Sequence, residues 1–153
     1  MGLVGGGEGF YTGYGPFPIE GDRGVYAIDL SGRKALVFGV ANHRSIAWHI
    51  ARGLHEAGAH LALAYQNERV KEEVERLAAT LGVEPPVLLV QCDVTRDGEI
   101  EAAFRRVGER FGLLHILVHS IAYANREDLG GEFSRTGREG FRLALEVSTY
   151  SLL

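Results

Sequence analysis

The fold of this 153-residue chain is decided by one stretch, Ala35-Leu36-Val37-Phe38-Gly39-Val40-Ala41-Asn42-His43-Arg44-Ser45-Ile46-Ala47. An apolar run ends at Gly39, a short polar turn follows, and Ser45 opens a segment whose apolar residues have helical spacing. The pattern predicts a strand over 34–38, a tight loop, and a helix over 45–57 that ends at Gly58. The residues expected to share the inner face of this helix are Ile46, Ala47, Ile50, Ala51 and Leu54.

The loop between this strand and helix has features of an anion site. Gly39 has no Cβ, so its backbone can approach a ligand closely. The helix start offers unpaired N–H groups and the positive end of a dipole, which suit a phosphate, and Ser45 can cap the helix and donate its hydroxyl to the same anion. The dinucleotide fingerprint G-x-G-x-x-G is absent. A strand–loop–helix unit that binds no ligand therefore stays open as the alternative.

The rest of the chain repeats this alternation. The run Val87–Cys92 is almost continuously apolar, as a sheet buried on both faces requires. Short links and right-handed crossovers predict an α/β fold, a Rossmann-like doubly wound parallel sheet of βαβαβαβ pattern in the order 3-2-1-4. The further elements expected are strands over 61–65, 87–92 and 113–119, and helices over about 68–81, over about 99–111 and from about residue 138.

Ligands of such sheets bind beyond the carboxyl ends of the strands, at the point where the strand order reverses. Four groups of residues follow the predicted strands and have no evident role in the core. They are Gly39, Tyr65-Gln66, Asp93-Val94 and His119-Ser120-Ile121. The sequence therefore predicts that these residues meet at one edge of the sheet.

Composition excludes several classes of protein. The net charge of −4 gives no general attraction to nucleic acid or to anionic membranes, and the apolar runs are too short to span a membrane. Cys92 is the only cysteine, which rules out an intramolecular disulfide, fits a reducing cytoplasm, and is typical of an inert core residue. The six histidines lack metal-ligand spacing, so no metal site is expected. Residues 1–30 are rich in Gly, Pro and Tyr, and we expect a flexible tail there, with the folded domain over 31–153.

Five motifs in register resemble a known family over about residues 30–153. They are Gly39-x5-Ser45-Ile46-Ala47, Tyr65-Gln66-Asn67-Glu68, Gln91-Cys92-Asp93-Val94, His119-Ser120-Ile121-Ala122 and Val147-Ser148-Thr149-Tyr150-Ser151. Together they resemble the bacterial enoyl-acyl-carrier-protein reductases, divergent members of the short-chain dehydrogenase/reductases. The resemblance implies reduction of the trans-2 double bond of an acyl chain on acyl carrier protein, with NADH as the hydride donor, in a cytoplasmic homotetramer.

The resemblance also implies roles for individual residues. Gly39, Ser45 and Ile46 would hold the pyrophosphate region of the cofactor, and Gln66 would lie near the adenosine ribose. Asp93 and Val94 would bracket the adenine, Ile121 would line the nicotinamide side, and Ala124 would contact the acyl substrate. Gln66 is not the acidic ribose anchor usual for NAD, but its amide can hydrogen-bond hydroxyl groups, and no cation follows it before Arg69, which favours NADH over NADPH. A turn or cap role before Thr95 remains a serious alternative for Asp93.

The catalytic part of the family pattern is absent. The Tyr-x6-Tyr-x6-Lys motif would follow the Tyr150 region, but the only lysines, Lys34 and Lys71, lie upstream. We therefore predict no catalytic residue in this chain and expect it to be the amino-terminal half of the enzyme, ending inside a helix whose apolar stripe is Phe141, Leu145, Ser148 and Leu152. The alternatives are a non-catalytic dinucleotide-binding fragment and a sister short-chain reductase, against which the Ser-Ile-Ala loop argues.

Overall fold

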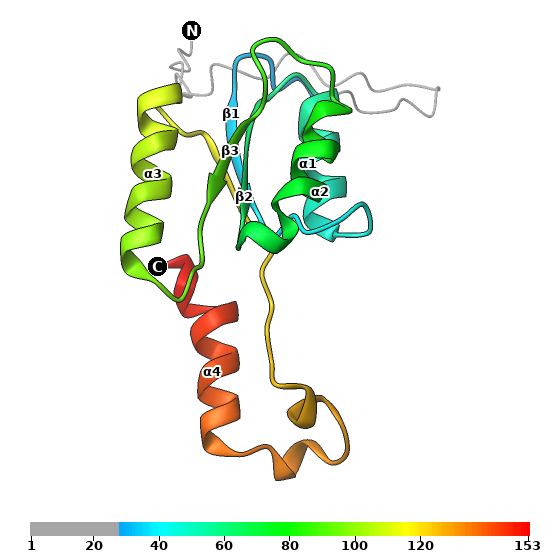
Figure 1. The fold of residues 1–153 in the computed structure, drawn as a ribbon, viewed down its shortest axis with the longest axis vertical. Helices are drawn as coiled ribbons and strands as arrows, with labels where there is room; N and C mark the ends of the chain where they lie inside the picture. Colours follow the sequence, from blue (N-terminus) through cyan, green and yellow to red (C-terminus); the bar gives the residue numbers. More distant parts are fainter. Residues whose placement is uncertain (1–27) are drawn as a thin grey trace, which may run out of the picture.

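The structure is a computed structural model that describes residues 28–153. Four parallel strands form one sheet in the order β3-β2-β1-β4, which confirms the predicted fold class and strand order (Figure 1). The strands are β1 (Lys34–Phe38), β2 (His60–Tyr65), β3 (Leu88–Gln91) and β4 (Ile116–His119). The predicted tail over 1–30 lies outside the described residues except for its last three. Of these, Leu30 donates its N–H to the Ala57 carbonyl at 2.7 Å.

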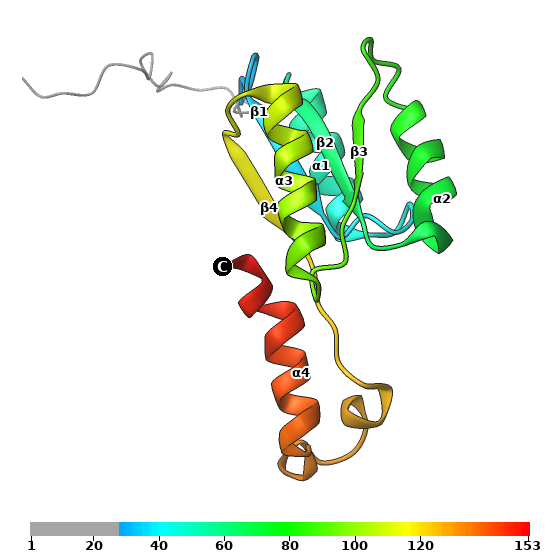
Figure 2. The same ribbon diagram turned by 60° about the vertical axis from the view of Figure 1, so that its left-hand side comes forward.

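Helices cover both faces of the sheet, so the central strands are buried on both sides (Figures 1 and 2). Successive residues of β1 point to opposite faces. Ala35 and Val37 join the core under α1 (Ile46–Glu56) and α2 (Glu68–Ala79), whereas Leu36 and Phe38 join the core under α3 (Asp97–Phe111). This double burial explains why the strands read as continuous apolar runs.

The structure corrects the predicted inner face of α1. Ile46 is 73 % exposed and Ile50 is also exposed, whereas Ala47, Trp48 and Ala51 are buried. Two adjacent stripes of this helix are apolar, and helical spacing alone does not choose between them. The small alanines allow a close approach to the sheet, and the Trp48 ring supplies the buried area. On α3, Phe104 is partly exposed, and its ring lies 6.2 Å from that of Phe38.

The chain leaves the sheet after β4 and forms α4 (Arg138–Ser148), which stands beyond the carboxyl edge of the strands (Figure 2). The predicted start of this helix near Arg138 is confirmed. Three 3-10 turns flank it, η1 (Arg126–Leu129), η2 (Phe133–Arg135) and η3 (Tyr150–Leu152). Between residues 28 and 153, no helix combines the length and the apolar character needed to cross a membrane.

Candidate functional site

A cleft of about 470 Å³ lies between the carboxyl ends of the strands and α4. Residues at the end of each strand or directly after it line the cleft, because parallel strands end at the same edge of the sheet. The opposite wall consists of Leu143 and Val147 from α4. The predicted site residues that line the cleft are Gly39, Gln66, Asp93, Val94 and Ile121. Ser45, Ile46 and Ala124 lie outside its lining.

Gly39 is required by the backbone of the neighbouring strand. Its φ of +96° belongs to the region that side-chain-bearing residues avoid. A Cβ at this position would lie 2.0 Å from the Ser120 carbonyl oxygen. The glycine therefore allows the ends of β1 and β4 to meet at the cleft, and this packing requirement adds to the ligand approach inferred from the sequence.

Ser45 organises the loop before α1 in a way that differs from the prediction. Its backbone is the N-cap of the helix, but its side chain makes no capping hydrogen bond to the helix. Instead, Ser45 Oγ accepts the N–H groups of Ala41 at 3.1 Å and Asn42 at 3.0 Å. The backbone of the loop turns so that the N–H groups of Ala41 and Asn42, and not those of the helix, point at the Ser45 hydroxyl. The Ile46 and Ala47 N–H groups, in the first turn, have no carbonyl within the helix to donate to.

The end of β2 presents an amide to the cleft. Gln66 is exposed and lines the cleft, whereas Asn67 caps α2 by accepting the Arg69 N–H at 3.1 Å. Lys71 forms an ion pair with Glu68 at 3.1 Å, and the hydrogen bond that Lys71 donates to the Glu68 carboxylate raises the pKa of Lys71. Over residues 28–153, no Lys or Arg side chain lines the cleft.

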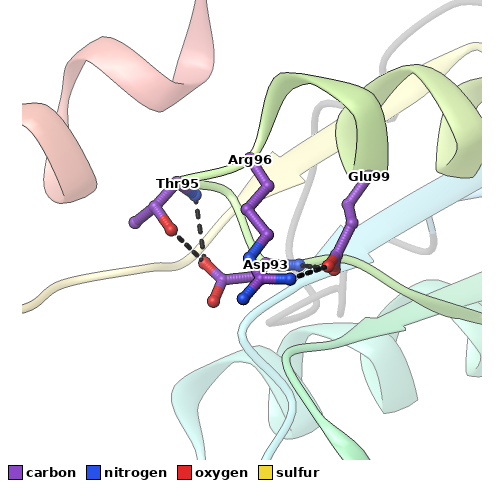
Figure 3. Close-up of polar contacts among 4 residues, drawn as sticks. All are labelled: Asp93, Thr95, Arg96 and Glu99. Atoms are coloured by element: carbon purple, nitrogen blue, oxygen red, sulfur yellow. Dashed lines mark hydrogen bonds and ion pairs between the residues drawn. The ribbon is translucent and has the colours of Figure 1, made fainter.

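Asp93 follows β3 and is held in a tight turn (Figure 3). Its Oδ1 accepts the Thr95 N–H at 3.0 Å and the Thr95 hydroxyl at 2.8 Å, so the turn role considered from the sequence is present. Partial burial acts to raise the pKa of Asp93, but the two hydrogen bonds from Thr95, with Arg96 and Gln66 nearby, outweigh it and hold the pKa below its usual value. Asp93 is therefore a carboxylate at neutral pH, and Oδ2 makes no hydrogen bond to the other residues drawn in Figure 3.

Glu99 in the first turn of α3 is a residue of this site that the sequence reasoning missed. Its Oε2 accepts the Asp93 N–H at 2.8 Å, and its Oε1 pairs with Arg96 Nη1 at 3.2 Å (Figure 3). A glutamate three residues inside a helix often reaches back to a preceding N–H group, and this spacing was the signal available in the sequence.

The neighbouring Cys92 fits the interpretation as an inert core residue. Its side chain is buried, and burial, with smaller contributions from Glu99 and Asp93, raises the pKa of the thiol to about 11. The thiol is therefore protonated at neutral pH and unreactive as a nucleophile.

Two serines of the last helical segment attach it to the end of β4. Ser148 Oγ accepts the Tyr123 N–H at 3.0 Å and donates to the Tyr123 carbonyl at 3.3 Å. Ser151 Oγ donates to the Val147 carbonyl at 2.7 Å and lies 2.7 Å from His119 Nε2. With the Ser151 proton used in this way, His119 Nε2 carries its proton and donates, which is a structural role.

The cleft therefore joins three chemically distinct places. The Asp93 carboxylate lies at the end of β3, the Gln66 amide lies at the end of β2, and the apolar Ile121 follows β4. The unpaired N–H groups at the start of α1 lie outside the lining of the cleft. Residues 28–153 contain no group of three His, Cys, Asp or Glu side chains close enough to hold a metal ion. Such a set of groups suits an elongated ligand with an amino-bearing ring, hydroxyl groups and phosphates.

Comparisons with known proteins agree on one family. Residues 39–153 match the model of the family described as enoyl-(acyl carrier protein) reductase. The NADH-dependent enoyl-[acyl-carrier-protein] reductase FabI of Bacillus subtilis is 51 % identical over 123 residues, which cover 80 % of this chain and 47 % of that protein. The NADPH-dependent FabI of Staphylococcus aureus is 42 % identical over 82 % of this chain and 48 % of its own length.

A solved structure shares the fold. The Bacillus cereus enoyl-acyl carrier protein reductase, determined with NADP+ and indole naphthyridinone, superposes with a TM-score of 0.77 at 49 % identity, covering 80 % of this chain and 48 % of that one. The chain thus spans about half the length of the curated relatives it matches. The family model covers most of the chain and the relatives share its sheet, so the chain belongs to the enoyl-(acyl carrier protein) reductase family.

Proposed function

We propose that this chain serves the NADH-dependent reduction of the trans-2 double bond of enoyl-acyl carrier protein in fatty acid biosynthesis, and that it supplies the cofactor-binding part of the enzyme. The observation that carries the proposal is the convergence of Gly39, Gln66, Asp93 and Ile121, from the ends of four strands, on one cleft. Relatives that share 42–51 % of the aligned residues are named for this reaction.

The cleft offers each part of NADH a suitable neighbour. The Asp93 carboxylate and Val94 receive the adenine, since a carboxylate oxygen accepts a hydrogen bond from an amino group. The Gln66 amide hydrogen-bonds the ribose hydroxyls. The first N–H groups of α1, at Ile46 and Ala47, are the donors available to the pyrophosphate, and Ser45 holds the loop before them through its hydroxyl. Ile121 packs beside the nicotinamide, and Ala124 lies on the side of the acyl chain.

The choice of NADH over NADPH follows from the charge at the end of β2. A 2′-phosphate needs a cation near the ribose. Gln66 is neutral, Asn67 is occupied as the cap of α2, and no Lys or Arg among the described residues lines the cleft. Relatives named for NADH and for NADPH both occur in the family, and the proposal assigns the preference of this chain to the neutral end of β2.

The proposal assigns the proton of the reaction to residues outside the given 153. When bound, NADH supplies the hydride for the double bond, and a protein acid supplies the proton. The two lysines of the sequence lie away from the cleft, because Lys34 Nζ donates to the Phe111 carbonyl and Lys71 pairs with Glu68. The chain by itself therefore binds cofactor without turnover.

A chimera tests the proposal. Residues 30–153 are joined to the part of Bacillus subtilis FabI that follows the aligned region, and NADH oxidation is followed at 340 nm with crotonyl-acyl carrier protein. We expect turnover by the chimera and none by residues 1–153. A folded chimera that binds neither NADH nor NADPH would contradict the proposal, and the complete Bacillus subtilis enzyme is the control.

The second candidate is a non-catalytic dinucleotide-binding chain. The observation that favours it is the absence of any Tyr-x6-Tyr-x6-Lys motif from the 153 residues. It predicts that residues 1–153 bind NADH as a stable, monodisperse protein. The first candidate predicts an associating chain that becomes monodisperse only in the chimera, so light scattering of both proteins distinguishes the two.

The remaining parts of the proposal concern partners and place. The substrate partner is enoyl-acyl carrier protein, the complete enzyme is a homotetramer, and its compartment is the cytoplasm. A single protonated cysteine is consistent with a reducing compartment. Light scattering of the chimera measures the assembly, and a mass other than four chains would contradict that part.

A further inference from the structure

The Asp93 backbone N–H faces a side of the sheet where no strand lies. Strand β3 is at the edge of the sheet, and its inner neighbour β2 uses the adjacent Cys92 N–H, which donates to the Tyr65 carbonyl at 2.8 Å. Because successive N–H groups of a strand point in opposite directions, the Asp93 N–H points outward. Glu99 Oε2 accepts it at 2.8 Å and takes the place of the missing strand (Figure 3).

We propose that Glu99 is a positioning residue that aims the Asp93 carboxylate at the amino group of the adenine ring. This inference rests on the proposed function. Two anchors fix Asp93: Glu99 holds its backbone N–H group, and Thr95 holds Oδ1 of its side chain through its own N–H and hydroxyl. Because both Thr95 donors bind Oδ1, Oδ2 is the carboxylate oxygen that is left for other donors, among which the Gln66 amide lies nearby.

Charge balance makes this arrangement of two carboxylates possible. Asp93 and Glu99 are adjacent, and their repulsion would turn the Asp93 side chain away from Glu99. Arg96 Nη1 pairs with Glu99 Oε1 at 3.2 Å, and the Arg96 N–H donates to the Asp93 carbonyl at 3.0 Å. The positive end of the α3 dipole stabilises the Glu99 carboxylate further. Arg96 therefore compensates the charge of Glu99 and ties the turn to the same helix start.

In this proposal Glu99 controls how well the Asp93 carboxylate recognises the amino group of the adenine ring. A hydrogen bond between an amino group and a charged acceptor depends on the direction of the acceptor. When Glu99 is removed, the Asp93 N–H loses its acceptor and the backbone of the turn is free to rotate. The Asp93 carboxylate stays in the cleft but no longer has a fixed direction, so selectivity for the amino group falls while the phosphate and ribose contacts persist.

The test compares two cofactors that differ only at this substituent. NADH and its purine analogue, which lacks the 6-amino group, are titrated into the chimera of residues 30–153 with the C-terminal part of Bacillus subtilis FabI, and their Kd values are compared. For the unaltered chimera we expect NADH to bind roughly tenfold more tightly or better, as for a hydrogen bond to a charged acceptor. Glu99→Ala brings the ratio close to one, and Glu99→Gln restores much of it because its amide oxygen accepts the Asp93 N–H.

Matched variants separate positioning from general damage. Glu109→Ala removes an exposed carboxylate from the same helix and leaves the ratio unchanged. Thr95→Val removes the hydroxyl that binds Asp93 Oδ1 and lowers the ratio even if Glu99→Ala does not fold. A loss of affinity for both cofactors by the same factor, with the ratio kept, would overturn the inference.

The outcomes for the inference and for the proposed function differ. If the unaltered chimera binds NADH with the expected preference and Glu99→Ala and Thr95→Val both keep that preference, the positioning role is wrong and the proposed function stands. If the folded chimera without these substitutions binds neither cofactor, the proposed function is wrong, and the inference fails with it.

Discussion

Two regions of this chain differ in the exposure of their apolar side chains. The sheet body, residues 30–119, buries them on both faces of the sheet, and Leu36 and Leu63 have no exposed surface. The C-terminal extension, residues 120–153, stands beyond the carboxyl edge, and its Phe133 is 81 % exposed (Figures 1 and 2). The body is stabilised by its own core, whereas the extension has apolar side chains that contact no core of its own.

The cleft lies where these two regions meet, and the body supplies most of its polar groups. The extension contributes an apolar wall and is attached through Ser148 and Ser151. In the Bacillus subtilis relative, about half of the length lies outside the matched region. The difference shows that the polar groups of the cleft and its apolar wall come from separate parts of the chain.

The largest expected effect contrasts one leucine from each region. Leu36→Ala removes a fully buried side chain and lowers the free energy of unfolding by about 2–5 kcal/mol. Leu145→Ala, at a position that is 47 % exposed, changes it by less than about 0.5 kcal/mol. Urea denaturation measures both. Equal losses would show that the extension has a packed core and would remove the contrast.

Glycine substitutions test the junction of β1 with β4. Gly39→Ala combines a strained positive φ, about 1–3 kcal/mol, with a collision against the Ser120 carbonyl, about 1–3 kcal/mol. Gly32→Ala is the control, because its φ is +75° but nothing lies within 4 Å of its Cβ. We expect Gly39→Ala to be clearly the more destabilising of the two in urea denaturation. Similar losses of unfolding free energy in the two variants would mean that the positive φ alone, without the contact to Ser120, requires a glycine at position 39.

Ser45 in the sheet body and Ser148 in the C-terminal extension each bind two backbone groups, and their alanine variants compare the two regions. Ser45→Ala leaves the part-buried N–H groups of Ala41 and Asn42 without their acceptor, which costs about 1–3 kcal/mol and weakens NADH binding. Ser148→Ala releases only Tyr123, so the urea midpoint stays and proteolysis within 120–137 becomes faster. Loss of body stability in Ser148→Ala would contradict the separation of the two regions.

The smallest change concerns cofactor preference, which we assign to the body alone. Gln66→Arg places a guanidinium at the end of β2, where it can pair with a 2′-phosphate. The affinity for NADPH relative to NADH should rise by about tenfold, as for one added charged hydrogen bond. Gln91→Arg, at an exposed position on β3, is the control. An unchanged ratio in Gln66→Arg would mean that β2 does not end at the ribose.

The sequence predicted the sheet and the cleft lining for a geometrical reason. Apolar runs mark strands that are buried on both faces, and parallel strands with short crossovers end together. Gly39, Gln66, Asp93 and Ile121 meet for that reason, although they are far apart in the chain.

Contacts set by loop conformation could not be predicted in this way. The Ser45 hydroxyl binds the turn instead of the helix, because the direction of Ala41 and Asn42 depends on backbone angles that no residue pattern specifies. Ala124 follows the last strand in a segment without periodicity, and it lies outside the cleft lining. The exposure of Ile46 has a related cause, since two apolar stripes on α1 compete for the sheet.

Hydrogen–deuterium exchange of residues 1–153, with and without NADH, tests the central claim most directly. If the cofactor occupies the cleft, the amides of residues 39–46, 66–67, 93–95 and 121–123 become protected, since all lie at the carboxyl edge of the sheet. Residues 83–87, at the opposite edge, and 126–137, in the extension, keep their exchange rates. Protection confined to 83–87, or no protection at saturating NADH, would contradict the claim that the four strand ends form the cofactor site.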